Sequence, residues 1–373
     1  MTTYRFMQPL DVLYLRGNKL FGDPGSFGES LIPPWPSVAA GALRSRMLAD
    51  DGVNPSDFAA GRSPHPTLGT PERPGTFAVT AFHLARRTTP GHVEGRFAPP
   101  ADLVLTRAED DTLVIERLTP RPAAAGILSS APLAKLPVLA ERARRKPVSG
   151  LWLTQRGWDR YLGGSVPTED DFELTTNLWK LDTRTGVGLD AERRCAHDGK
   201  LFTAQAASLA SDVGFLVGVR GAEASASGTV RLGGDGRAAA IQGIDYEPPE
   251  PDFDALLQAR RCRVVLTTPG LFAEGWLLPG ARSDGRWQLG DVSGRLACAA
   301  VPRAEVVSGW DLAQWQPKPA QRAASTGSVY WIEDLHATSD ALRKLVETGL
   351  WTDPRDNLQR RAEGFNRFTF AVY

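Results

Sequence analysis

Residues 183–203 read TRTGVGLDAERRCAHDGKLFT, two strand-like runs joined by a charged, turn-forming centre. Cys195, His197 and Asp198 lie within four residues of one another in that centre. Residues two apart on a strand face the same side, so Cys195 and His197 can meet, as a nucleophile and its base would. No oxyanion motif accompanies them, and the flanking glycines and arginines equally suit a hairpin that touches a polyanion. The stretch predicts a strand–turn–strand unit whose chemistry depends on the rest of the chain.

The composition is that of a folded globular protein with two domains of ordinary size, or one large one. The chain has 373 residues, 42% hydrophobic and 23% charged, which is enough apolar material for a substantial core. Lys+Arg and Asp+Glu balance at 43 each, so any nucleic-acid surface requires local charge asymmetry. No apolar run is long enough for a membrane span and no targeting signal is recognisable, which predicts a cytoplasmic protein without a membrane partner.

The cysteines and histidines form no pattern typical of a metal or disulfide site. Cys195, Cys262 and Cys298 are few and far apart, which fits a reducing compartment. The five histidines have no metal-ligand spacing, so we expect no metal and no cofactor. No P-loop occurs, and GGDGR at 233–237 is short and lies between strand-like runs, so it predicts a hairpin turn.

Strand-like runs alternate with a few helices along the whole chain. We expect strands at 3–15, 76–85, 212–221, 327–335 and 367–373, and helices at 37–52, capped by Ser37 and ended by Gly52, and at 339–351, capped by Ser339. The alternating phenylalanines of the last strand predict one buried face. These elements predict an α+β fold with antiparallel sheets and helices on one face. Their order fits a β-α-β-β-α-β plan used twice, in domains at 1–222 and 223–373.

Two further segments carry clusters of basic residues. Residues 120–148 are rich in Pro and Ala and contain RARRK at 142–146, which predicts an exposed insertion. RRAEGFNRFTF at 360–370 places a glycine just before the last strand, with Arg360, Arg361 and Arg367 around it. A glycine there lets backbone N–H groups approach a phosphate, although it also suits a simple turn.

Five stretches together resemble one protein family. They are PLDVLYLRGNKLFG (9–22), PPWPSVAAGALRSRM (33–47), the opening stretch at 183–203, VRLGGDGR (230–237), and GSVYWIE (327–333) followed by a glycine near the end. In order and separation they resemble the third subunit of the Cmr complex, the type III-B CRISPR effector, within the RAMP superfamily. The first two stretches are the most specific, and the resemblance covers essentially the whole chain.

The resemblance implies a non-catalytic RNA-binding subunit that serves antiviral defence. Such subunits have two ferredoxin-like (RRM-like) halves with inserted loops and a β-hairpin thumb. They hold the 5′ repeat-derived tag of the guide RNA (crRNA). Their implied partners are that tag, the large Cas10-type subunit and the backbone RAMP subunits. Recognition of a constant tag suits single-stranded RNA, whose unpaired bases can enter pockets.

The resemblance also assigns residues to the RNA path. Ser37 and Arg44 match the helix that borders the RNA, although Ala40 replaces a lysine that backbone RAMP subunits often carry. On the thumb hairpin and the C-terminal glycine loop, the implied RNA-binding residues are Arg184, Arg193, Arg194, Gly364, Asn366 and Arg367. Asn366 occupies the place of the loop's usual second glycine, and asparagine tolerates a left-handed backbone better than most residues.

Two alternatives remain open at this level. One is a metal-independent endoribonuclease of the same superfamily, which would process guide-RNA precursors with a His or Tyr. His92 in a glycine-flanked loop is its first candidate residue and His197 its second. The other is a scaffold whose contacts are all with protein.

Overall fold

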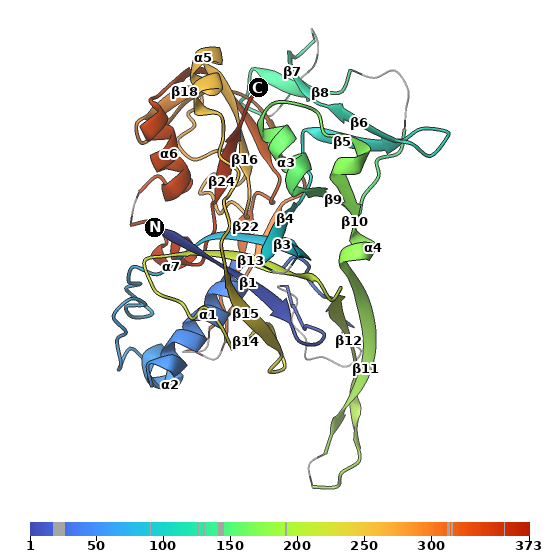
Figure 1. The fold of residues 1–373 in the computed structure, drawn as a ribbon, viewed down its shortest axis with the longest axis vertical. Helices are drawn as coiled ribbons and strands as arrows, with labels where there is room; N and C mark the ends of the chain where they lie inside the picture. Colours follow the sequence, from blue (N-terminus) through green and yellow to red (C-terminus); the bar gives the residue numbers. More distant parts are fainter. Residues whose placement is uncertain are drawn as a thin grey trace.

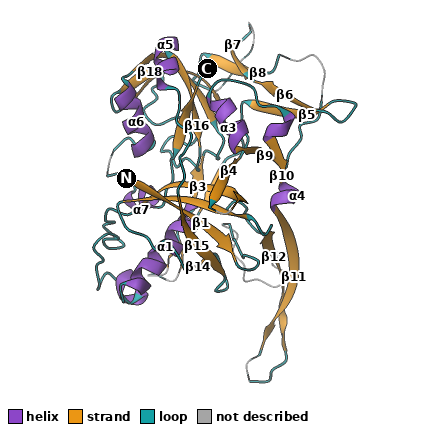
Figure 2. Cartoon of the chain, viewed as in Figure 1, coloured by secondary structure: helices purple, strands orange, loops and turns teal. Residues whose placement is uncertain are grey.

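The computed structural model describes residues 1–17, 27–89, 91–124, 127, 129, 131–140, 145–190, 192–311, 314, 316–353 and 355–373. Strands outweigh helices, and they gather into two large antiparallel sheets with a long hairpin beside them (Figures 1 and 2). The predicted α+β class with antiparallel sheets is confirmed. Residues 18–22 of the first family-like stretch and 142–144 of the basic cluster lie outside the described residues.

The first sheet has eight strands in the order β10-β9-β4-β3-β13-β1-β15-β14. Every neighbouring pair in it runs antiparallel. Its strands are β1 (Thr2–Pro9), β3 (Ala78–Thr89), β4 (His92–Phe97), β9 (Leu151–Thr154), β10 (Phe172–Leu174), β13 (Val213–Arg220), β14 (Thr229–Arg231) and β15 (Ala238–Ile244). The turn predicted at 233–237 does join β14 to β15, with Asp235 and Gly236 at positive φ.

Helix α1 (Pro36–Asp50) packs on the first sheet, and α2 (Pro55–Ala59) follows it. Leu43 on α1 and Phe215 on β13 are fully buried in the shared core. The predicted caps were wrong by small shifts. Trp35 is the N-cap of α1, because Pro36 takes the first helical position, where its missing N–H costs nothing. Thr338, not Ser339, caps α6 (Ser339–Thr348), through a hydrogen bond from Ala341 N.

The second sheet has the order β17-β18-β23-β16-β24 and is also antiparallel. Its strands are β16 (Arg261–Leu266), β17 (Arg286–Leu289), β18 (Val292–Ala300), β23 (Val329–His336) and β24 (Phe368–Ala371); its helices are α5 (Phe253–Ala259), α6 and α7 (Leu358–Ala362). The prediction of one buried face on the last strand was wrong, since all of β24 is buried. Phe368 and Phe370 fill the second core, while Ala371 packs with Tyr161 of α3 (Gln155–Leu162).

Four short antiparallel hairpins lie outside the two large sheets in the described chain. They pair β5 (Leu103–Arg107) with β6 (Leu113–Arg117), β7 (Thr119–Pro122) with β8 (Lys135–Val138), β19 (Glu305–Val307) with β22 (Gln321–Ala323), and β20 (Trp310–Asp311) with β21 (Gln316–Pro317). A 3-10 turn, η1 (Glu169–Asp171), precedes β10. The predicted insertion thus contains the mostly exposed β7–β8 hairpin, which is tied to the second sheet by an ion pair of 2.5 Å between Lys135 and Glu333.

The opening stretch forms the hairpin that the sequence predicts. β11 (Trp179–Leu189) and β12 (Ala196–Leu209), preceded by α4 (Thr175–Leu178), pair antiparallel and extend well beyond the body of the molecule (Figure 1). We call this hairpin, residues 179–209, the thumb. A short strand, β2 (Phe27–Gly28), lies parallel to β12 near its root and makes the thumb a three-stranded sheet there.

Candidate nucleic-acid interface

The root of the thumb positions Arg184. In the register of the three strands, Arg184 on β11 lies opposite Ala204 on β12, which in turn lies opposite Gly28 on β2. The guanidinium is exposed and its Nε donates to Asp182 at 2.8 Å. Hydrogen bonds with Asp182 and Tyr14 raise the pKa of Arg184, so it is a fixed positive charge at the thumb's root.

The tip of the thumb presents the other two predicted arginines. The Asp190 carboxylate accepts hydrogen bonds from the backbone of Glu192 and Arg193 at 2.9 and 3.0 Å, which shapes the turn. Arg194 then adopts a left-handed backbone, φ 52°. Both arginine side chains are exposed, with no described acidic side chain in ion-pair range. The tip therefore presents two exposed arginines in a turn that also carries Asp190, Glu192 and Asp198.

The cysteine–histidine pair of the opening stretch forms no catalytic contact. Cys195 is a free, exposed thiol, and His197 is exposed as well. The Nδ1 atom of His197 lies 3.0 Å from the carbonyl oxygen of Asp198, so the ring's hydrogen bond goes to backbone. The triplet belongs to the turn and the return strand of the thumb.

Arg44 and the C-terminal loop meet in a buried ionic cluster. The carboxylate of Glu363, with its side chain 4% exposed, lies 3.9 Å from Arg44, 3.1 Å from Lys318 and 3.0 Å from Arg360. The guanidinium of Arg44 also lies over the Phe77 ring, 5.4 Å from its centroid. Burial lowers the pKa of Arg44 and Glu363 opposes that effect. The cluster joins α1 to the glycine loop. From the sequence, these two segments were linked only by their resemblance to the same family.

The glycine loop itself is packed inside the protein. Gly364 has φ 91°, and a Cβ there would lie 3.0 Å from the carbonyl oxygen of Val79. The side chain of Asn366 accepts from Leu271 N at 2.6 Å and donates to Leu350 O at 2.9 Å. Asn366 also has a left-handed backbone, as its place in the loop predicted. These contacts hold the loop against β3 of the first sheet and against Leu271 and Leu350.

Arg367 and Ser37 differ in their exposure to solvent. The Arg367 guanidinium is 4% exposed and donates to Glu347 O at 2.7 Å. Burial and the nearby Arg220 and Arg361 lower the pKa of Arg367 to about 10. Ser37 is half-buried on the first turn of α1. Of the predicted RNA contacts, those on the thumb are exposed and those on the glycine loop are buried. Contact with RNA stays a prediction for all eight residues.

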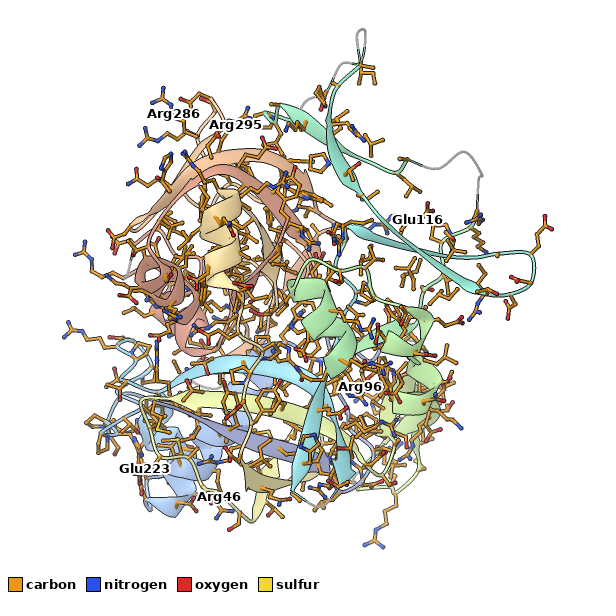
Figure 3. The ribbon with its side chains drawn as sticks, turned by 45° about the horizontal axis from the view of Figure 1, so that its top comes forward. Arg46, Arg96, Glu116, Glu223, Arg286 and Arg295 are labelled. Carbon is orange, nitrogen blue, oxygen red and sulfur yellow. The ribbon has the colours of Figure 1, made fainter. Side chains whose placement is uncertain are left out.

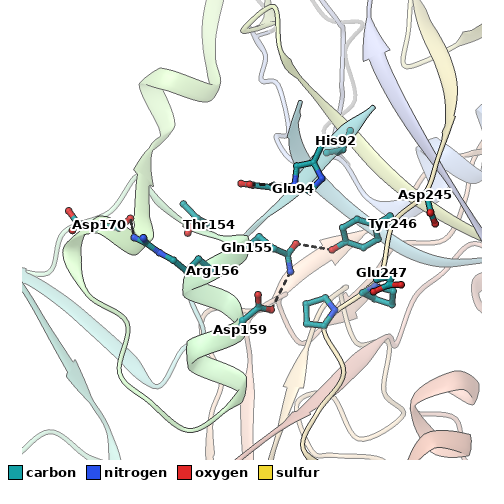
Figure 4. Close-up of a pocket in the computed structure, with 13 residues that line it drawn as sticks. His92, Glu94, Thr154, Gln155, Arg156, Asp159, Asp170, Asp245, Tyr246 and Glu247 are labelled. Carbon is teal, nitrogen blue, oxygen red and sulfur yellow. Dashed lines mark hydrogen bonds and ion pairs between the residues drawn. The ribbon is translucent and has the colours of Figure 1, made fainter. Parts of the chain in front are cut away.

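A separate cleft of about 800 Å³ lies where α3 meets the segment after β15 (Figure 4). Tyr246 donates to Gln155 Oε1 at 2.9 Å across it, and Gln155 in turn bonds Asp159. Its walls carry five carboxylates and only one arginine: Glu94, Asp159, Asp170, Asp245, Glu247 and Arg156. A cleft of this sign repels a phosphate backbone. Nothing in the sequence pattern pointed to it.

The alternative nuclease residues stand on different elements. His92 lies at the start of β4 on the rim of this cleft, with Nε2 3.8 Å from Glu94, whereas His197 is on the thumb. Within the described ranges, no three His, Cys, Asp or Glu side chains gather as a metal site would need. The helices of the described chain also include none with the length and apolar character of a membrane span.

Comparison with known proteins agrees with the resemblance seen in the sequence. The family model for CRISPR-associated protein (Cas_Cmr3) matches residues 5–370. Two solved chains come from the type III-B Cmr-beta complex. The one bound to cognate target RNA is 14% identical with a TM-score of 0.50, and covers 98% of this chain and 96% of its own.

The second solved chain, from the complex bound to cognate target RNA and AMPPnP, is 13% identical with a TM-score of 0.49, over 99% and 100% of the two chains. No curated protein sequence matches. At these identities the solved chains bear on the fold alone, while the family model spans nearly every residue. The chain therefore belongs to the Cas_Cmr3 family of CRISPR-associated proteins.

Proposed function

We propose that this chain is a non-catalytic RNA-binding subunit of a type III-B CRISPR effector. It holds the 5′ repeat-derived tag of the guide RNA and docks the large Cas10-type subunit and the backbone RAMP subunits. We place it in the cytoplasm. Membership of the Cas_Cmr3 family supports a role in such a complex. The similar solved chains were taken from Cmr-beta complexes bound to target RNA, which is consistent with a role in such a complex.

One observation carries the RNA-binding part. The thumb extends from the body and presents Arg184 at its root and Arg193 and Arg194 at its exposed tip. The whole chain has zero net charge, so these local cations are what attract a polyanion. The acidic cleft described above repels RNA, which leaves the thumb side as the RNA face.

The proposed fold is two ferredoxin-like halves, at 1–222 and 223–373. The second sheet supports it, because β18-β23-β16-β24 has the second-third-first-fourth order of that plan. The strands β3-β13-β1-β15 repeat this order in the first sheet. Each half has one helix of the plan, α1 in the first and α6 in the second. Because β15 pairs with β1, we propose that the first half extends past the boundary predicted at 222, to Ile244 at the end of β15.

Assembly on two guide RNAs tests tag reading. The complex is reconstituted with guides that differ only in the presence of the 5′ tag, and the retention of this chain is measured by band shift. We expect firm retention on the tagged guide and loss on the tagless guide. Equal assembly on both would end the tag-reading role.

Incubation with repeat RNA tests the absence of catalysis. Purified full-length chain is mixed with repeat RNA in EDTA and the products are resolved on a sequencing gel. We expect intact RNA. Specific cleavage that disappears in His92→Ala or His197→Ala would instead establish the metal-independent nuclease.

A further inference from the structure

Three arginines gather at the end of the first sheet that lies away from the thumb. Arg220 is the last residue of β13, Arg361 lies on α7, and Arg367 comes just before β24. β13 enters the sheet beside the root of the thumb, and at ~3.3 Å per residue it carries Arg220 about 23 Å away from there. Arg220 pairs with Thr2, so this end of the sheet lies by the N-terminus, across the molecule from the thumb (Figure 1). We call Arg220, Arg361 and Arg367 the arginine cluster.

The C-terminal end of α6 holds two of these side chains close together. Arg367 Nη1 donates to Glu347 O at 2.7 Å, and Arg220 Nη2 donates to the same carbonyl oxygen at 3.4 Å. That oxygen belongs to the last turn of α6, whose carbonyl groups carry partial negative charge and favour cations beside them. A carbonyl group has no net charge, so the two guanidiniums are brought together without being neutralised.

Carboxylates balance little of the positive charge in the cluster. Among the described residues, the ion pair of Arg220 is with Glu347 at 3.7 Å, and the Glu347 side chain is 70% exposed. No described carboxylate lies in ion-pair range of Arg367, and its buried Nε forms no hydrogen bond in the described chain. Burial and Arg220 lower the pKa of Arg361, while burial, Arg220 and Arg361 lower the pKa of Arg367, so the three charges repel one another. An anion that binds here relieves that repulsion.

Two of the three arginines are accessible to a ligand. The Arg220 side chain is 38% exposed, and Arg361 is half-buried. Arg367, by contrast, is buried and contributes its charge from inside the protein. A guanidinium donates two parallel N–H groups to one carboxylate, which makes arginine well suited to Asp and Glu side chains. The cluster thus offers two contact residues and one buried charge to an anion.

The surroundings of the cluster favour acidic side chains over single-stranded RNA as its ligand. Proteins bind single-stranded RNA by stacking its bases on aromatic rings as well as by contacting its phosphates. The exposed tryptophan and phenylalanine side chains of the described chain lie on β2, in the loop after β16 and on β20; they are Phe27, Trp276 and Trp310. None of them lies on β13, α6 or α7, the elements around the cluster. The proposed RNA face, moreover, is that of the thumb.

We propose that the arginine cluster binds an acidic segment of a partner protein, with Asp or Glu carboxylates of that segment on Arg220 and Arg361. The inference rests on the proposed function for the existence of partner subunits, and it names the chemistry by which one of them docks. Arg367, which the family resemblance assigned to the RNA path, strengthens this protein contact through its buried charge. Because the cluster and the thumb lie at opposite ends of β13, RNA and the acidic segment can bind at the same time.

A short acidic peptide tests this directly. Binding of fluorescein-labelled hexaglutamate to the full-length chain is measured at low salt by fluorescence anisotropy, and binding of a labelled uridine octamer is measured in parallel. We expect Arg220→Glu and Arg361→Glu each to weaken peptide binding about tenfold, because each reverses a charge that a carboxylate meets. The octamer affinity should stay unchanged in both. Arg286→Glu, at an exposed arginine of the second half, is the control matched in charge and should alter neither affinity.

Arg220→Gln separates binding from a structural role, and it replaces Arg220→Glu if a charge reversal beside Glu347 prevents folding. It should weaken peptide binding too. It should not lower the melting temperature of the ligand-free chain, since it removes repulsion within the cluster. A lower melting temperature with unchanged peptide binding would make Arg220 a structural clamp on α6 and would overturn the inference.

The remaining outcomes are equally decisive. The inference fails if the wild-type chain shows no measurable peptide binding, or if Arg286→Glu weakens that binding as much as Arg220→Glu does. It also fails if Arg220→Glu weakens octamer binding as much as peptide binding, which would assign the cluster to RNA. Tag reading is tested independently by assembly on tagged and tagless guides. Equal assembly on those guides, together with peptide binding that depends on Arg220 and Arg361, would remove tag reading and leave the acidic-segment site standing.

Discussion

Arg263 and Asp102 form an ion pair of 2.6 Å in which neither side chain is exposed to solvent. Arg263 lies on β16 of the second sheet, and Asp102 lies just before β5, after the first sheet's β4. The hydroxyl of Tyr161 donates to the other oxygen of Asp102 at 2.7 Å, and Arg263 Nε donates to Val372 O at 3.0 Å. This buried network joins the segment before β5 and helix α3 to the second sheet.

Removing the cation should therefore destabilise the whole chain. In Arg263→Leu the carboxylate of Asp102 stays buried without its main partner, so we expect the free energy of unfolding to fall by about 3–5 kcal/mol. Urea unfolding followed by tryptophan fluorescence measures this. Arg286→Leu, an exposed residue at the outer edge of the second half (Figure 3), should change it by less than about 0.5 kcal/mol. Equal effects of the two variants would refute the bridging role.

Gly364 should not tolerate a side chain. Alanine there combines the strain of φ 91° with a Cβ 3.0 Å from Val79 O, so we expect Gly364→Ala to cost about 1–3 kcal/mol. The control is Gly41→Ala in α1, where a Cβ meets nothing within 4 Å. Alanine favours a helix over glycine, so that variant should gain about 0.5–1 kcal/mol. A thermal shift of the same sign in both variants would show that the loop is looser than described.

The tip of the thumb should contribute through charge alone. Arg193→Glu with Arg194→Glu should weaken retention of guide RNA by roughly tenfold at low salt. It should also reduce the slope of log affinity against log salt by about 1.4, at 0.7 for each lost phosphate contact. Filter binding across a salt series measures both quantities in the assembled complex. An unchanged slope would mean that the tip faces protein. The single charge reversals Arg193→Glu and Arg286→Glu, compared with each other, supply the control matched in charge.

His83 should make the fold sensitive to mild acid. It lies on β3 with its ring 4.9 Å from that of Phe97, and burial lowers its pKa to about 4. An unfolded histidine titrates near 6.5, so as the pH falls the unfolded state takes up the proton first. Stability is therefore lost between about pH 6.5 and 4. Between pH 7.5 and 5.0 this histidine should cost about 2 kcal/mol, and less if its partial exposure keeps it hydrated.

Urea unfolding of wild type and His83→Gln at the two pH values measures that contribution. The variant should lose less stability than the wild type on going to pH 5.0. Parallel losses in both proteins would assign the acid sensitivity to other groups.

The elements that could be predicted from the sequence are those with local signals. The helix after residue 35, the turn at Asp235 and Gly236, and the thumb all follow from short-range patterns of apolar, turn-forming and capping residues. Where the prediction missed by a residue or two, neighbouring residues could fill the same position. Pro36, for example, takes the first helical position of α1, so the cap lies at Trp35 and not at Ser37. The burial of both faces of the last strand was not predicted, because the helix that covers its second face, α3, comes from about two hundred residues earlier in the chain.

The long-range features had no signal that a single sequence carries. The chain has many acidic and many basic residues, and nothing in the sequence indicates that Asp102 pairs with Arg263. Only the folded structure shows this pair. A cavity of about 260 Å³ likewise has both Trp35 and Glu305 in its lining, although they are 270 positions apart in the sequence. Glycine, arginine and asparagine in the C-terminal loop could be aligned with a family. Their burial against Val79 and Leu350 depends on packing that no local pattern encodes.

The thumb's second strand gives the molecule a mechanical property. β12 pairs with β11 in one continuous register from Leu201 to Leu209, so at ~3.3 Å per residue this regular part of the thumb is about 30 Å long. Its root is clamped where Ala207 exchanges two hydrogen bonds of 2.8 Å with Leu13, and β13 begins only a few residues later in the middle of the first sheet. A displacement of this regular part of the thumb is thus transmitted to the centre of the first sheet through a paired strand rather than through a long loop.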